Sequence, residues 1–215
     1  VQKKILNQEG ITDKHIFVVG NTIVDAVFQH KEIALKQSKI LSQLNFSKNK
    51  YILFTAHRSL NVDNKKSLQK LISTIEFIKK STDLPVVYPM HPRTKAKLKA
   101  FNLTIKDALL MKPLGYLDFL NLEMNAKMIV TDSGGVQEEA CILKVPCITI
   151  RENTERPETV SVGGNRIVNF DHTKLHDAID YFNSNTSFWN NPFGDGRTSE
   201  KIMEVLELKE LPLLD

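Results

Sequence analysis

Residues 127–143 have the sequence KMIVTDSGGVQEEACIL, and this stretch predicts the fold. The apolar run at 127–131 is typical of a buried strand, and the segment 135–143 is typical of a helix. The two glycines between them permit a tight turn. A strand that enters a helix through such a turn is the repeating unit of a parallel α/β sheet.

Short β-branched runs alternate with helical stretches over the rest of the chain. We expect strands at residues 15–19, 51–55, 85–88, 108–111, 127–131, 146–150 and 166–168. We expect helices at residues 22–37, 61–80, 94–100, 116–125, 135–143, 173–182 and 199–208, and a loop at 184–196. Successive crossovers of this kind predict an α/β fold with a Rossmann-like, doubly wound parallel sheet.

Composition excludes several classes of protein. The chain has 215 residues, of which 41% are hydrophobic and 25% charged, so it is neither collagen-like nor wholly disordered. The only cysteines, Cys141 and Cys147, are not spaced like a zinc site or a secreted disulfide framework. A net charge of +4 with scattered basic residues argues against nucleic acid as a partner.

No apolar run approaches the ~20 residues of a membrane span, and no signal peptide is visible, so we expect a cytoplasmic protein without a membrane partner. The chain begins at Val1 without an initiator Met. We therefore expect either a processed start or a portion of a longer chain.

Four expected strands are followed by polar or glycine-containing segments, at residues 56–61, 89–93, 132–135 and 151–158. The turn at 132–135 suits a phosphate or diphosphate, because a helix N-terminus offers unpaired N–H groups and a favourable dipole. Ser133 could donate to a phosphate oxygen, and a plain N-cap is an equally good interpretation. The segment 151–158 is either a solvated charge run or a fixed network.

His57 and Arg58 pair a titratable donor with a permanent cation, which suits a phosphate leaving group, although a surface pair is the alternative. Glu138 and Glu139 lie near a helix N-terminus, where the dipole alone favours carboxylates. One of the two could instead hold a ribose diol. His91 lies between two prolines, which favours a structural role.

Together these segments resemble the UDP-N-acetylglucosamine 2-epimerase family of the non-hydrolysing type. The matching pieces occur in the family's order from about Phe17 onward: VGNTIVD at 19–25, TAHR at 55–58, PMHP at 89–92, TDSGGVQEEA at 131–140, Arg151, and TERPE at 154–158. The combination of DSGGxQEE with TERPE is highly specific for this family.

The resemblance implies the C-terminal half of a two-domain, GT-B-like fold. Residues 1–20 would be a remnant of the N-terminal domain or a linker, residues 21–196 the UDP-binding domain, and residues 197–215 a C-terminal helix and tail. The implied reaction converts UDP-GlcNAc to UDP-ManNAc by anti elimination of UDP and re-addition, as in cell-envelope polysaccharide biosynthesis. It requires no cofactor and no metal.

The family's acid/base carboxylates lie in the N-terminal domain, so this portion is expected to be inactive alone. The full-length protein is expected to be a homodimer.

The resemblance also implies a role for individual residues. His57 would assist the departure of UDP, and Arg58 would lie at the diphosphate. The other implied contacts are the phosphate cradle of Ser133, Gly134 and Gly135, the ribose acceptor Glu139, the cleft-facing Arg156, the uracil neighbours Tyr116 and Phe119, and His91 at an allosteric site.

Three alternatives remain open. Residues 91–94, HPRT, also occur in enzymes for related sugars such as UDP-2,3-diacetamido-2,3-dideoxyglucuronate. A GT-B glycosyltransferase domain would share the diphosphate site. A non-catalytic interaction module is the third alternative, favoured only by Leu60, where the family often has Glu.

Overall fold

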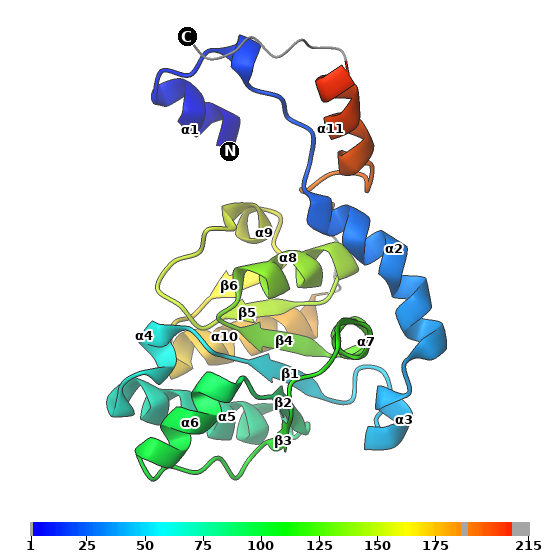
Figure 1. Ribbon diagram of the computed structural model, residues 1–215. Coiled ribbons are helices and arrows are strands. Elements are labelled where there is room, and N and C mark those ends of the chain that lie inside the picture. The colour runs from blue at the N-terminus through cyan, green and yellow to red at the C-terminus, as the bar shows by residue number, and fades with distance from the viewer. Residues whose placement is uncertain (1, 186–188, 208–215) are drawn as a thin grey trace.

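The computed structural model describes residues 2–185 and 189–207, and it contains one six-stranded parallel sheet (Figure 1). The strands are β1 (Ile52–Thr55), β2 (Val86–Pro89), β3 (Leu109–Met111), β4 (Met128–Thr131), β5 (Cys147–Thr149) and β6 (Asn165–Ile167). Their order across the sheet is β3-β2-β1-β4-β5-β6, with every pair parallel. The expected doubly wound, Rossmann-like α/β sheet is therefore confirmed.

Helices cover both faces of this sheet (Figure 1). The helices of the described residues are α1 (Gln2–Gln8), α2 (Thr22–Gln37), α3 (Ile40–Leu44), α4 (Ser59–Val62), α5 (Lys65–Thr82), α6 (Pro92–Ala100), α7 (Tyr116–Asn125), α8 (Gly134–Leu143), α9 (Pro157–Ser161), α10 (His172–Ser184) and α11 (Thr198–Glu207). Of these, α1 and α11 lie away from the sheet (Figure 1). Apolar side chains of α5, α6 and α10 form the core on one face, and those of α3, α7 and α8 form the core on the other. Helix α2 packs outside α7 and α8.

Strand β1 shows why its sequence is almost continuously apolar. Ile52 and Phe54 pack in the core beside α5 and α10, whereas Leu53 packs in the core beside α7 and α8. All three side chains are fully or almost fully buried. A strand covered on both faces needs apolar residues at every position, which is the pattern that predicted it.

The expected strand at 15–19 is wrong. A 3-10 turn occupies Asp13–His15, and the residues that follow are extended without belonging to the sheet. Val18 is 78% exposed and Phe17 is 42% exposed. β-branched and aromatic residues favour strands, which explains the prediction, but residues 15–19 do not join the sheet.

The expected helix at 61–80 is divided into α4 and α5. Asn64 lies between them in extended conformation, and its Oδ1 accepts a hydrogen bond from Ser67 N at 2.8 Å. This N-cap starts a new helix and ends the continuity of the periodic pattern. Of the expected helix at 199–208 and loop at 184–196, Leu208 and residues 186–188 lie outside the described residues.

The sheet order places the junction of its two halves between β1 and β4. From β1 the chain proceeds through β2 to β3 in one direction, and from β4 through β5 to β6 in the other. The carboxyl ends of β1 and β4 therefore border the crevice in which doubly wound sheets bind ligands. No helix within the described ranges is long and apolar enough to cross a membrane.

Candidate functional site

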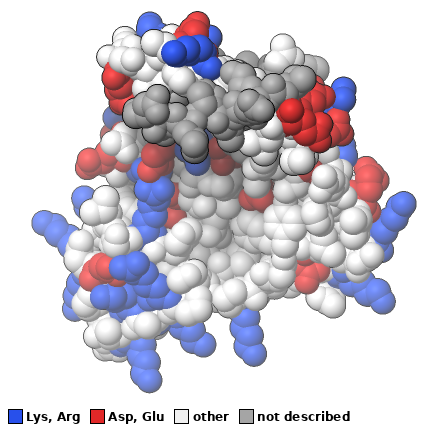
Figure 2. Space-filling model, turned by 45° about the horizontal axis from the view of Figure 1, so that its top comes forward, with Lys and Arg blue, Asp and Glu red and all other residues white. Residues whose placement is uncertain are grey.

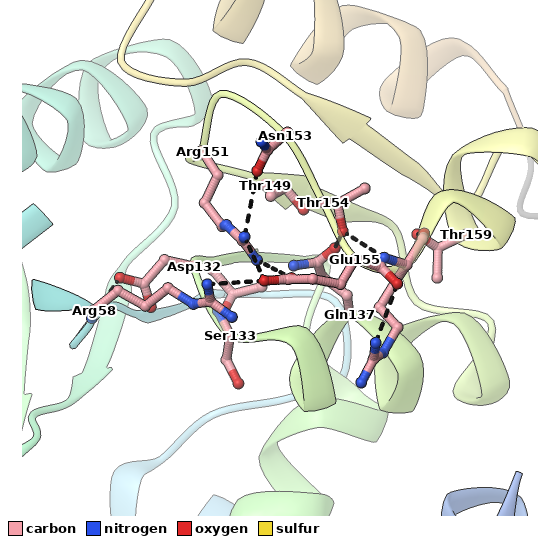
Figure 3. Close-up of polar contacts among 12 residues, drawn as sticks. Arg58, Asp132, Ser133, Gln137, Thr149, Arg151, Asn153, Thr154, Glu155 and Thr159 are labelled. Atoms are coloured by element: carbon pink, nitrogen blue, oxygen red, sulfur yellow. Dashed lines mark hydrogen bonds and ion pairs between the residues drawn. The ribbon is translucent and has the colours of Figure 1, made fainter. Parts of the chain in front are cut away.

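A buried carboxylate joins the ends of the two central strands. Asp132 follows β4 directly and is fully buried. It accepts hydrogen bonds from His57 N at 3.1 Å, from Arg58 N at 2.9 Å and from Asn61 Nδ2 at 3.0 Å. The segment after β1 is thereby held against the end of β4, beside the first turn of α8 (Figure 3). His57 and Arg58 consequently lie at the same edge of the sheet as Asp132 and the turn that follows it.

The imidazole of His57 is held on two sides. Its Nδ1 lies 3.6 Å from Asp132 Oδ1, and its ring stacks on that of His91 with centroids 5.3 Å apart. The His57 side chain is still 40% exposed, so its other ring nitrogen can face a ligand. His91 Nδ1 accepts a hydrogen bond from Arg93 N at 3.1 Å and caps α6, which agrees with the structural interpretation of His91.

The turn after β4 uses the backbone N–H of Ser133, which donates to Thr131 Oγ1 at 2.9 Å, but not its hydroxyl as a cap. Ser133 is the N-cap residue of α8, but its side chain makes no capping hydrogen bond. A Cβ added to Gly135 would meet nothing within 4 Å, and one added to Gly134 would meet only Glu155 Oε2, at 3.9 Å. The space in front of the α8 N-terminus is thus open on this side apart from the Glu155 carboxylate. Such a position favours an anion.

An anionic group of the chain itself already lies there. Glu155 Oε1 is 3.0 Å from Arg58 Nη1 and 2.8 Å from Arg151 Nη2, and Glu155 Oε2 is 2.5 Å from Arg151 Nη1 (Figure 3). These hydrogen bonds hold the pKa of Glu155 far below its usual range. Two guanidinium groups and a helix N-terminus therefore surround one negative charge, as they would surround a phosphate.

The TERPE segment is a fixed network, which decides between the two interpretations of residues 151–158. Gln137 Oε1 accepts hydrogen bonds from Thr154 Oγ1 at 2.5 Å and from Asn165 Nδ2 at 3.1 Å. Buried Asn165 also contacts Thr149 and Thr159, at 2.8 and 3.0 Å. Side chains of α8, β5 and β6 thus fix the loop that carries Arg151 and Glu155.

Glu138 and Glu139 have separate surroundings. Glu138 Oε1 is 2.5 Å from Arg156 Nε and accepts a hydrogen bond from Asn21 Nδ2 at 2.8 Å. Glu138 and Arg156 therefore join α8, α9 and the start of α2. Arg156 Nη1 also donates to the backbone oxygen of Glu155 at 3.1 Å, whereas Arg58 and Arg151 contact the Glu155 carboxylate. Burial raises the pKa of Glu138, and its partners partly oppose this shift.

Glu139 lies beside Tyr116 and a second carboxyl group, Glu123 of α7. Burial raises the pKa of Glu139 to about 7. Tyr116, at the start of α7, is 39% exposed and contacts the ring of His30 edge to face, with centroids 5.5 Å apart. Phe119 is partly buried and packs against the core formed by α3, α7 and α8. Of the two expected uracil neighbours, Tyr116 is the more accessible.

The sequence pattern indicates no individual role for Asp132, Arg151, Glu155 or Glu123. A charged residue directly after the apolar run of β4 is the one available signal for Asp132. Within the described ranges, no group of three or more His, Cys, Asp or Glu side chains is arranged to hold a metal ion.

Known proteins of one family match this chain. A family model described as UDP-N-acetylglucosamine 2-epimerase matches residues 1–207. The UDP-N-acetylglucosamine 2-epimerase of Methanocaldococcus jannaschii is 47% identical over 213 residues, which cover 96% of this chain and 58% of that relative. The Escherichia coli K12 enzyme of the same name is 30% identical over 223 residues, with 97% and 59% covered. The chain thus spans about 58% of the length of a curated relative.

Solved structures give the same result. A crystal structure of the M. jannaschii UDP-GlcNAc 2-epimerase in complex with UDP-GlcNAc and UDP has a TM-score of 0.89 at 48% identity, covering 96% of this chain and 59% of that one. The Neisseria meningitidis UDP-GlcNAc 2-epimerase bound to UDP-GlcNAc has a TM-score of 0.84 at 27% identity, with the same coverage. On the family match and these identities, the chain belongs to the UDP-N-acetylglucosamine 2-epimerase family.

Proposed function

We propose that this chain holds the UDP moiety of a UDP-N-acetylhexosamine in an enzyme that inverts C2 of the sugar, with residues 21–196 as the UDP-binding domain. The observation that carries the proposal is the anion position at the α8 N-terminus, between Arg58 and Arg151. Relatives of this chain are UDP-GlcNAc 2-epimerases, and two of their structures hold UDP-GlcNAc.

In the proposed reaction a carboxylate of the N-terminal domain takes the C2 proton, the C2–H electron pair forms the C1–C2 double bond, and the C1–O bond breaks with its electron pair passing to the β-phosphate oxygen. A glycal forms, and UDP then adds back as a proton returns to the opposite face of C2. Arg58 and the first N–H groups of α8 would stabilise the departing diphosphate. The diphosphate would replace the Glu155 carboxylate as the hydrogen-bond acceptor of Arg58 and Arg151. His57 would donate to the leaving oxygen, and Glu139 would accept from the ribose hydroxyls.

Sugar and partner assignments belong to the same proposal. We take UDP-GlcNAc and UDP-ManNAc as the epimers because the relatives act on UDP-GlcNAc by name. UDP-2,3-diacetamido-2,3-dideoxyglucuronate is the alternative substrate for the same assay.

A homodimer in the cytoplasm is the assembly we propose for the full-length enzyme. Lys and Arg side chains are spread around the edge of the face in Figure 2, without one concentrated basic patch there.

The chain is expected to bind UDP weakly in calorimetry and to bind CMP less well. Gly134→Ala should reduce UDP affinity about 10-fold, because the new methyl group would enter the space of a phosphate that approaches the backbone closely. Its melting temperature should be unchanged or higher, since the free chain has room for this Cβ and alanine favours a helix. Absence of UDP binding at millimolar concentration would remove support for the phosphate cradle.

Solvent deuterium separates the epimerase from a GT-B glycosyltransferase. In D2O the full-length enzyme should introduce deuterium at C2 of the UDP-sugar, because the C2 proton exchanges in each epimerisation. NMR of the recovered sugar measures this exchange. Transfer of the sugar to an acceptor with C2 still carrying protium would instead identify a glycosyltransferase.

A further inference from the structure

The carboxyl group of Glu123 is buried without a donor. Glu123 lies on α7, its exposed fraction is zero, and neither Oε1 nor Oε2 has a hydrogen-bond partner among the described residues. A carboxyl group removed from water without a partner is costly, and native structures rarely contain one without a reason. The proposed chemistry above does not use this residue.

Its neighbour is another carboxyl group. Glu139, on the facing helix α8, is 8% exposed and contacts Glu123. Burial and the Glu139 carboxylate both raise the pKa of Glu123 well above its usual range. Two adjoining carboxyl groups cannot both be ionised cheaply, whereas one proton between them supplies the missing donor.

No cation balances this pair in the described part of the chain. The other titratable groups that interact with one or both carboxyls are Tyr116 on α7, Glu138 on α8, Tyr51 before β1 and Cys147 on β5. The Tyr51 hydroxyl donates to Leu122 O at 2.6 Å, and Glu138 is paired with Arg156. Cys147 is a fully buried free thiol. A shared proton is therefore the partner that this arrangement requires.

We propose that Glu123 is a positioning residue for the ribose-binding carboxylate. Glu123 stays protonated and donates a hydrogen bond to the Glu139 carboxylate. Glu139 is thereby oriented towards the nucleotide as an acceptor for the ribose 2′- and 3′-hydroxyls. The inference rests on the proposed function, because it assumes that Glu139 receives the ribose. It adds a residue that lies behind the site and acts only through Glu139.

Two substitutions test the proposal through nucleotide binding. Glu123→Gln replaces the carboxylic acid with an amide that still donates, so its UDP affinity at pH 8 should stay within about 3-fold of wild type. Glu123→Leu is similar in size but has no donor, and UDP affinity should fall about 10-fold. This variant should fold, because an apolar side chain suits the buried position. With 2′-deoxyUDP the difference between the two variants should shrink.

A ligand-free measurement separates this inference from the proposed function. Glu123 and Glu139 have folded-state pKa values above the unfolded value of about 4.3, so each contributes stability that is lost as pH rises towards its folded pKa. Glu123→Gln removes the Glu123 contribution. The melting temperature of wild type should therefore fall more than that of the variant as pH rises from about 5 to about 8. The difference between the two should change by about 5–10 °C in favour of the variant.

Each outcome has one meaning. A constant difference in melting temperature from pH 5 to pH 8 would overturn the shared proton. Equal UDP affinity of Glu123→Leu and wild type, or equal losses for UDP and 2′-deoxyUDP, would overturn the positioning role. If wild type binds neither nucleotide while the pH-dependent difference persists, the proposed function fails and the carboxyl pair stands.

Discussion

Asp132→Ala is expected to lower the free energy of unfolding by roughly 3–5 kcal/mol, the range for removing one partner from a buried charged network. Asp132 is fully buried and accepts hydrogen bonds from His57 N, Arg58 N and Asn61 Nδ2. Without the carboxylate the two backbone N–H groups would lose their acceptor at the junction of β1 and β4, and Asn61 Nδ2 would keep only Ile150 O, at 3.3 Å. Urea denaturation followed by circular dichroism measures the loss.

Two variants test whether loss of the Asp132 carboxylate itself causes the lower stability. Asp132→Asn keeps the volume and one acceptor oxygen, so it should lose less stability, about 1–3 kcal/mol. Asp63→Ala removes a carboxylate that pairs with Arg93 and Lys97 at the surface, and its effect should be small. If Asp132→Ala is as stable as Asp63→Ala, the strand ends are held together by other contacts.

The sequence predicted the type of sheet better than the number of its strands. Strand β1 is apolar from Ile52 to Phe54 because both faces are buried, and that signal is local. Whether a β-branched run has a neighbouring strand is not local information, and for this reason the segment 15–19 was wrongly expected in the sheet. The order of the strands follows from long-range packing, which propensity does not encode.

The candidate site was also predictable only in part from the sequence. The turn at Ser133 and the pair His57-Arg58 were found because each is contiguous and follows a strand. The helix pattern alone does not distinguish Glu138 from Glu139, because adjacent residues on a helix point about 100° apart and only the fold decides what each one meets. The choice of Glu139 rests on the family resemblance. The Glu155 contacts join Arg58 and Arg151 from different strand ends, so no single segment predicts them.

His57→Ala in the full-length enzyme is expected to reduce kcat about 10²-fold, the usual contribution of a side chain that transfers a proton to a leaving group. The ring is oriented for such a role by Asp132 Oδ1, 3.6 Å from Nδ1, and by the stacked ring of His91. UDP affinity should change much less, because Arg58 and the α8 N-terminus remain. Steady-state epimerisation and calorimetry with UDP measure the two effects separately.

His91→Asn is the matched control for this experiment. Asparagine can still cap α6, as the His91 side chain does, but it removes the ring that stacks on His57. If His57 acts on the leaving group and His91 only supports its ring, kcat should fall less in His91→Asn than in His57→Ala. If both kcat and UDP affinity were unchanged in His57→Ala, His57 would have no role in the site. A loss of UDP affinity without a loss of kcat would make His57 a binding residue, because only an interaction that strengthens in the transition state changes kcat.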